Sequence, residues 1–251
     1  MKFSIFQESR IGRRKSNQDR LNYSYTRDAL LMVVADGMGG HLMGEVAAQI
    51  AVDRLDESFQ REAKPALSDP LQFLSRALTD AHHAIFNFAA ERFLPEVPRT
   101  TCVACIVQHG VAYWTHVGDS RLYAIRAGKV LAQTRDHTRV QMLLEQGLID
   151  AASAAVHPAR HRIYSCLGGD LPPQLEPGSQ TPLQSGDIIA LCTDGAWGPL
   201  LDDTLVRGLA ESTPMETVPY LLDLAEAEAG VGSDNLTLMA MQWGDNSAMA
   251  Q

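Results

Sequence analysis

The sequence predicts an α+β fold in which antiparallel sheets are covered by helices. Short apolar, β-rich runs fall into two batches, one before residue 36 and the other after residue 100, with a last strand near the end. Helical periodicity comes in pairs of segments between and after these batches, and tight turns separate most of the strands. The 251 residues, 45% hydrophobic and 20% charged, supply ample apolar material for a core.

The first batch contains three predicted strands, at residues 3–6, 21–26 and 29–35. The third is continuously apolar, which predicts a buried strand. It stops at Asp36-Gly37, where a glycine-rich turn allows close backbone approaches. A carboxylate at that position is costly unless a cation or hydrogen-bond donors meet it. Taken alone, Asp36 is explained equally well as a turn residue.

Two helices are predicted next, at residues 45–61 and 70–93. The second carries one apolar face at helical spacing. His82 and His83 lie in this helix without an acidic or cysteine partner at ligand spacing, so we expect them at the surface.

The second batch begins with four strands that we interpret as one antiparallel meander, at 101–108, 112–117, 122–126 and 129–133. A short helix at 138–146 and an irregular segment at 148–169 follow; such long loops are often functional. A buried strand at 187–193, helices at 203–209 and 215–229, and a strand at 236–243 complete the chain. We expect one domain spanning residues 1–251, with a flexible tail at 244–251.

Composition excludes several classes of function. The formal net charge of −9 and the pI of about 5.3 argue against binding to nucleic acid or to an anionic membrane. The sequence shows no signal peptide and no run of membrane-spanning length, so we expect a cytoplasmic protein. We also expect it to be a monomer. Cys102 and Cys105 form a CxxC whose spacing points them to opposite faces of a strand, which favours burial over redox or zinc chemistry.

Five acidic turns stand at predicted strand ends. They contain Asp19, Asp36, Asp119, Asp194 and Asp234. Each aspartate alone is typical of a turn, but antiparallel sheets can bring distant strand ends to one edge. Carboxylates gathered there would repel one another unless cations lie between them. Oxygen ligands without a Cys or His cluster favour Mg²⁺ or Mn²⁺ over Zn²⁺.

These turns, taken in order, resemble the motifs of the PPM/PP2C protein phosphatases, most closely their stand-alone bacterial branch. The motifs are R-x-x-N-Q-D, A-D-G-M-G-G-H, G-D-S-R, T-D-G and S-D-N, starting at residues 14, 35, 118, 193 and 233. The resemblance covers residues 3–243. It implies a four-layer α/β/β/α sandwich of two central antiparallel sheets flanked by helix pairs. It also implies metal-dependent hydrolysis of phosphoserine and phosphothreonine in proteins by a metal-bound water, opposing a bacterial Ser/Thr kinase.

The resemblance also assigns the metal ligands. Asp36 would bridge two core ions, Asp194 and Asp234 would complete the first site, and the Gly37 carbonyl would bind the second ion. Asp19 would act mainly through metal-bound waters. A third, weaker site would use Asp119 and Asp194.

Three further roles follow from the resemblance, and each suits the chemistry. Arg14 would grip the phosphate, whose oxygens match its bidentate fork. His41 would protonate the serine alkoxide, a poor leaving group. Asn235 would orient a metal-bound water. Two divalent ions roughly 3.5–4 Å apart would neutralise the phosphate dianion and generate a hydroxide near neutral pH.

One position departs from the pattern of the animal members. They carry a carboxylate immediately before the aspartate of the first motif, whereas this chain has Gln18, as many bacterial members do. The second ion would therefore be held by more water. The segment 148–169 corresponds to the family's flap beside the active site, where Arg160, His161 and Arg162 could contact substrate.

Other functions stay open at this point. A phosphatase of an anti-anti-sigma phosphoserine would fit the same motifs. A non-catalytic phosphoprotein-binding member should have lost metal aspartates, but all are present here. A two-metal nuclease or phosphodiesterase is disfavoured by the acidic net charge.

Overall fold

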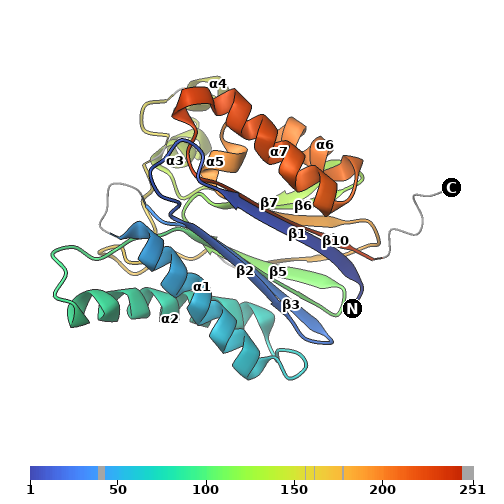
Figure 1. Ribbon diagram of the computed structural model, residues 1–251, viewed down its shortest axis with the longest axis horizontal. Helices are drawn as coiled ribbons and strands as arrows, with labels where there is room; N and C mark the ends of the chain where they lie inside the picture. Colours follow the sequence, from blue (N-terminus) through green and yellow to red (C-terminus); the bar gives the residue numbers. More distant parts are fainter. Residues whose placement is uncertain (39–42, 156, 161, 177, 245–251) are drawn as a thin grey trace.

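Two five-stranded antiparallel sheets form the centre of the molecule, as seen in a computed structural model that describes all residues except 39–42, 156, 161, 177 and 245–251. Sheet A has the strand order β1-β10-β9-β6-β7, and sheet B has the order β2-β3-β4-β5-β8. Figure 1 shows the sheets stacked on each other, with helices on both outer faces. The predicted α+β sandwich with four layers is confirmed.

The strands of sheet A combine both ends of the chain with its middle. They are β1 (Phe3–Arg10), β10 (Leu236–Trp243), β9 (Ile188–Cys192), β6 (Arg121–Arg126) and β7 (Lys129–Gln133). Sheet B consists of β2 (Asp19–Tyr25), β3 (Ala29–Asp36), β4 (Cys102–Gln108), β5 (Val111–Val117) and β8 (Ser179–Pro182).

The helices cover the two sheets in separate pairs. Sheet B is covered by α1 (Gly44–Glu62) and α2 (Pro70–Glu91), and sheet A by α6 (Asp202–Glu211) and α7 (Pro214–Ala229). Shorter elements are α3 (Arg139–Glu145), α4 (Ala151–Ala155), α5 (Asp194–Trp197) and the 3₁₀ turn η1 (Gly230–Gly232). None of the helices in the described part of the chain combines the length and the hydropathy that crossing a lipid bilayer requires.

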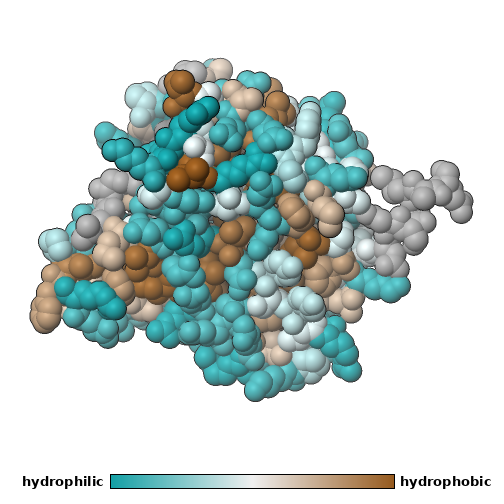
Figure 2. Space-filling model, in the orientation of Figure 1, coloured by the Kyte–Doolittle hydropathy of each residue, from teal (hydrophilic) through white to brown (hydrophobic). Residues whose placement is uncertain are grey.

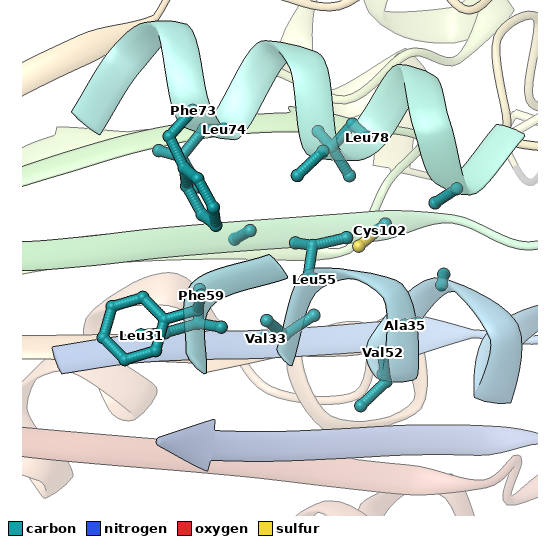
Figure 3. Packing of buried hydrophobic residues seen from close by; sticks show 14 of the residues in the cluster. Leu31, Val33, Ala35, Val52, Leu55, Phe59, Phe73, Leu74, Leu78 and Cys102 are labelled. Carbon is teal, nitrogen blue, oxygen red and sulfur yellow. The ribbon is translucent and has the colours of Figure 1, made fainter. Parts of the chain in front are cut away.

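Strand β3 contributes side chains to two hydrophobic cores, one beneath α1 and α2 and one between the two sheets. Its side chains alternate between the two faces of sheet B. Leu31 and Val33 pack against α1 and α2, whereas Met32 and Val34 face sheet A. Figure 3 shows Leu31 and Val33 beneath Leu55 and Phe59 of α1. Because both faces are buried, the strand is continuously apolar and ends abruptly at the polar site.

The cysteines behave as predicted. All four are free and buried. Cys102 faces the helices of sheet B and Cys105 faces sheet A, so the CxxC pair points to opposite sides of β4. Burial raises the pKa of the Cys102 thiol to about 12, which disfavours a reactive thiolate.

The predicted four-stranded meander is wrong, because its strands divide between the two sheets. Strands β4 and β5 pair in sheet B, but the chain then crosses at residues 118–120 and pairs β6 with β7 and β9 in sheet A. Alternation of apolar residues predicts where the strands lie, but it does not predict which neighbour each strand will pair with.

Three smaller expectations also need correction. The irregular segment 148–169 contains the short helix α4, and the sequence reading missed both β8 and α5. His82 is buried rather than at the surface. Its Nδ1 accepts a hydrogen bond from the Gly168 amide at 3.2 Å. His83 is exposed as expected. The predicted tail lies outside the described residues apart from Gly244.

Candidate active site

The five motif aspartates come from both sheets and lie at one end of the sandwich. Asp19 begins β2 and Asp36 ends β3, and the two are direct partners across the antiparallel pair. On the side of sheet A, Asp194 is the first residue of α5, Asp119 lies in the crossover from β5 to β6, and Asp234 directly precedes β10. The fold therefore brings together strand ends that are up to 215 residues apart in the chain, from Asp19 to Asp234.

Asp36 is at the electrostatic centre of this group. Loss of solvation raises the pKa of its carboxyl well above the usual range, and the charges of the other four aspartates raise it further. The main chain around it is fixed to the segment that leads into β4, because the Asp36 carbonyl accepts hydrogen bonds from the Thr101 amide at 2.9 Å and the Thr100 hydroxyl at 2.8 Å.

Asp19 is buried with only one of its carboxylate oxygens satisfied. Its Oδ2 accepts hydrogen bonds from the hydroxyls of Thr193 at 2.9 Å and Thr237 at 2.7 Å, which tie sheet B to sheet A. Its Oδ1 is buried and has no hydrogen-bond partner among the described residues. Burial, with smaller contributions from the charges of Asp194 and Asp234, raises the pKa of Asp19 to about 7 despite the two hydroxyls.

Asp234 and Asn235 form a turn that holds the loop between β1 and β2 (residues 11–18). Arg14 Nη2 pairs with Asp234 Oδ2 at 2.6 Å. The side-chain amide of Asn235 donates to the carbonyls of Ile11 and Ser16, both at 2.9 Å, and its Oδ1 accepts from the Gln18 amide. Asn235 therefore shapes this loop with the same polar atoms that the sequence analysis expected to act on water.

Two glycines, Gly195 of the T-D-G motif and Gly12 just before the first motif, permit close backbone contacts that a side chain would prevent. A Cβ at Gly195 would lie 1.9 Å from the Asn235 carbonyl oxygen, so glycine allows α5 to pack on the Asp234 turn. Gly12 has a φ of +58°, and a Cβ there would lie 2.0 Å from the Asp234 carbonyl oxygen. The requirement for glycine at both positions comes from contacts with the main chain of the distant Asp234-Asn235 turn.

The turn that carries Asp119 is held from three sides. The Trp197 indole donates to the Asp119 carbonyl at 3.0 Å, and the Ser120 and Thr101 hydroxyls are 2.7 Å apart. The Gly118 amide donates to His137 Nδ1 at 3.2 Å, while the His137 amide donates back to the Gly118 carbonyl at 2.9 Å. Burial, above all, raises the pKa of the Asp119 carboxyl.

Several residues of this arrangement were not singled out from the sequence. They are Thr101, His137, Thr193, Trp197 and Thr237. Thr193 stands inside the T-D-G motif and was within reach of the sequence analysis. The others carry no local signal, since each becomes relevant only through its partner in another element.

Of the remaining predicted residues, some lie close to the site, some are exposed, and two lie outside the described part of the chain. Gly37 is joined to the first motif, because its amide donates to the Gln18 carbonyl at 3.2 Å. His41 and His161 lie outside the described residues. Arg160 and Arg162 are exposed on the segment 148–169. That segment is connected to the site through Tyr164, whose amide donates to the His137 carbonyl and whose ring stacks on His137.

The donor set fits a hard divalent cation. In the described part of the chain, no three Asp, Glu, His or Cys side chains converge tightly enough to hold an ion by themselves. The unpartnered Asp19 Oδ1 and the mutually repelling carboxylates around Asp36 nevertheless leave buried negative charge that such an ion would neutralise.

Comparison with known proteins agrees with this geometry. Residues 6–227 match the protein phosphatase 2C family. The serine/threonine protein phosphatase PstP of Mycobacterium tuberculosis is 33% identical over 227 residues, which cover 90% of this chain but 42% of PstP.

Solved structures extend the similarity to the whole fold. The serine/threonine phosphatase Stp1 of Staphylococcus aureus superposes with a TM-score of 0.89 at 27% identity, covering 98% of this chain and 96% of Stp1. The catalytic domain of PstP in complex with two manganese ions superposes with a TM-score of 0.82 at 29% identity, covering 97% of this chain and 99% of that domain. With the motif aspartates gathered at one end of this sandwich, the chain belongs to the protein phosphatase 2C family.

Proposed function

We propose that this chain is a metal-dependent phosphatase that hydrolyses phosphoserine and phosphothreonine in proteins. The observation that carries the proposal is the carboxylate of Asp36, faced by the charges of four aspartates from other elements of a protein phosphatase 2C fold. A binding module would have no need to maintain this repulsion, whereas a cation-dependent hydrolase requires it.

We assign the cations as Mn²⁺ or Mg²⁺, with two core ions and a third weaker site. Asp36 would bridge the core ions, Asp194 and Asp234 would complete the first site, and Gly37 would contribute its carbonyl to the second. Asp19 would contribute through water, and Asp119 with Asp194 would form the third site. When bound, the ions neutralise phosphate charge and lower the pKa of a coordinated water toward neutrality.

Arg14 is the substrate-binding residue of the proposal. Its side chain is half exposed, and one guanidinium nitrogen is paired with Asp234. Asp234 would hold a cation in the metal-loaded enzyme, and the Arg14 guanidinium would then be free to turn from this carboxylate to the substrate. The planar fork can then bind two oxygens of the substrate phosphate, which a lysine cannot do.

His41 is proposed as the acid that protonates the leaving serine or threonine oxygen. Asn235 has a positioning role through the loop that carries Arg14, to which its amide is bonded. A water-orienting role for Asn235 remains part of the proposal.

In its biological setting, the enzyme would act as a cytoplasmic monomer of one domain and reverse the action of a bacterial Ser/Thr protein kinase. The support is that PstP, Stp1 and other relatives are bacterial serine/threonine phosphatases.

Activity assays test the proposal directly. Hydrolysis of p-nitrophenyl phosphate and of a phosphothreonine peptide is measured with EDTA, Mg²⁺ or Mn²⁺ for the wild type, Asp194→Ala and Asp203→Ala. Asp203 is an exposed aspartate on α6 and serves as the matched control. We expect Mn²⁺-dependent turnover that collapses only in Asp194→Ala. A folded wild type that turns over neither substrate with any divalent ion would disprove the proposed activity.

A further inference from the structure

The loop between β1 and β2 presents three consecutive cations, Arg13, Arg14 and Lys15, all of them exposed. They contrast with the formal net charge of −9 on the whole chain. Arg14 is paired with Asp234, but Arg13 and Lys15 make no salt bridge with any residue that the structure describes. Two positive charges next to the proposed phosphate-binding arginine are thus available to an external anion.

The main chain of this loop is fixed to the active site. Asn235 bonds to the carbonyls of Ile11 and Ser16 on both sides of the three cations, and the Arg13 amide donates to the Ser233 carbonyl at 3.2 Å. Gly12 packs against the Asp234 carbonyl at a distance that excludes any side chain. Figure 1 shows the loop, in dark blue, at the same end of the sheets as α5, which begins with Asp194. The cations are therefore held at the rim of the site by the turn that carries Asp234.

We propose that Arg13 and Lys15 form a binding surface for carboxylate side chains that flank the phosphorylated residue of a substrate protein. This inference rests on the proposed phosphatase function and names its substrate class as acidic phosphopeptide segments. Consecutive Cα atoms are about 3.8 Å apart, and an extended peptide advances about 3.3–3.6 Å per residue. Cations on both sides of Arg14 therefore match anionic side chains one or two positions from the phosphoresidue.

Charge complementarity also supports a role for this loop in orienting an acidic substrate. An acidic substrate approaches a protein of the same sign, so a local positive patch is needed to steer and orient it. Exposed ion pairs are weak individually, and two of them predict a preference of about fivefold rather than absolute selection. Screening by salt should reduce that preference, because the Debye length is about 8 Å at physiological ionic strength.

The alternative is that Arg13 and Lys15 only offset the negative charge of the aspartates. In that case their removal would change metal affinity and would affect all substrates alike. Under the first explanation only substrates with acidic flanking residues should be affected, and under the second all substrates should be. A phosphate ester without flanking residues therefore distinguishes them.

The test compares Arg13→Gln/Lys15→Gln with the control variant Lys64→Gln/Lys129→Gln. The control removes two exposed cations outside the β1–β2 loop: Lys64 follows the C-terminal end of α1, and Lys129 begins β7. Both variants lower the net charge equally. For each, kcat/KM is measured at saturating Mn²⁺ on three phosphothreonine peptides with Asp/Glu, Asn/Gln or Lys flanks. Each value is divided by that for p-nitrophenyl phosphate, so that a general loss of activity cancels.

We expect the acidic-flank ratio to fall about fivefold in Arg13→Gln/Lys15→Gln, mainly through KM, and the difference to shrink at 0.5 M NaCl. The neutral-flank ratio and the Lys64→Gln/Lys129→Gln variant should show no comparable fall. Equal losses on all peptides, or none on the acidic one, would overturn the inference. Absence of turnover in the wild type would instead count against the phosphatase proposal itself.

Discussion

The indole nitrogen of Trp197 donates a hydrogen bond to the main-chain carbonyl of Asp119 at 3.0 Å. Trp197 ends α5, the short helix that begins with Asp194, so this bond joins the elements that carry the two aspartates of the proposed third metal site. The Arg121 guanidinium lies over the indole, 3.3 Å from the ring centroid, and is paired with Asp136 through both of its oxygens. The indole is thus held on one face by a paired cation while its N–H fixes the Asp119 turn.

Trp197→Phe should weaken the third metal site while leaving the fold intact. Phenylalanine keeps an aromatic ring beneath Arg121 but loses the N–H, at a cost of about 0.5–1.5 kcal/mol. We expect Mn²⁺ at the weakest site to bind roughly threefold to tenfold less tightly by isothermal titration calorimetry. Trp114→Phe, in the interior between the sheets, is the control for loss of a tryptophan. Unchanged affinities at all sites in Trp197→Phe would contradict the positioning role.

The buried carboxylates should make the metal-free protein less stable as the pH rises. The pKa of Asp19 is about 7 in the folded chain against an ordinary value of 3.8, so between these values the folded state holds a proton that the unfolded state has released. The contribution of Asp19 to the free energy of unfolding therefore falls as the pH rises through this window.

Mn²⁺ binds the deprotonated carboxylates and should reverse the trend, so the increase in Tm upon adding Mn²⁺ grows from pH 6 to pH 8. The measurement is thermal unfolding in EDTA and in Mn²⁺ at each pH. Because His137 contributes the opposite slope below pH 6.5, the two proteins are compared: in EDTA, Asp19→Asn should lose less Tm than the wild type as the pH rises from 5 to 7. Equal slopes for the two proteins would contradict the prediction.

Gly12→Ala should destabilise the protein more than Gly147→Ala. Both glycines have a positive φ, of +58° and +67°, so each substitution costs about 1 kcal/mol in backbone strain. Only at Gly12 would the new Cβ collide with the Asp234 carbonyl, whereas nothing lies within 4 Å at Gly147. Urea unfolding of the two variants measures the difference. Equal losses of stability would mean that the loop and the Asp234 turn separate easily.

His137 should make the protein sensitive to acid. Burial, with a smaller contribution from His116, lowers its pKa to about 4 from an ordinary value of 6.5. Between these values the unfolded state binds a proton that the folded state does not, so the contribution of His137 to the free energy of unfolding falls as the pH is lowered from 6.5 to 4. Glu176, whose Oε1 is 3.6 Å from His137 Nε2, is the acidic group facing it.

Urea unfolding at pH 7.5, 6 and 5 tests this dependence. His137→Gln should be less stable than the wild type at pH 7.5 but lose less stability on acidification. The exposed His83→Gln serves as the control and should keep the slope of the wild type. If His137→Gln also keeps that slope, the acid sensitivity arises elsewhere, with the buried His116 as the next group to test.

The surface offers fewer clues than the site. Figure 2 shows mainly hydrophilic residues on this face, with smaller apolar groups between them.

The amino-acid sequence by itself determined most of the strands and helices, the apolar character of β3 and the candidate metal aspartates. These features are local: burial on one or both faces imposes a period on the residues, and a turn needs particular residue types where it stands. The cysteines of β4 were placed correctly for the same reason, because the period of a strand decides which face each one occupies.

Only the tertiary structure decided how those elements combine. It divided the predicted meander between two sheets, buried His82 against Gly168, and placed Thr193 and Thr237 on Asp19. It also engaged Asn235 with the loop that carries Arg14. Each of these contacts joins residues more than 40 positions apart, and no local pattern specifies the partner. Their formation depends on which strands pair and in what register, which the packing of the whole chain settles.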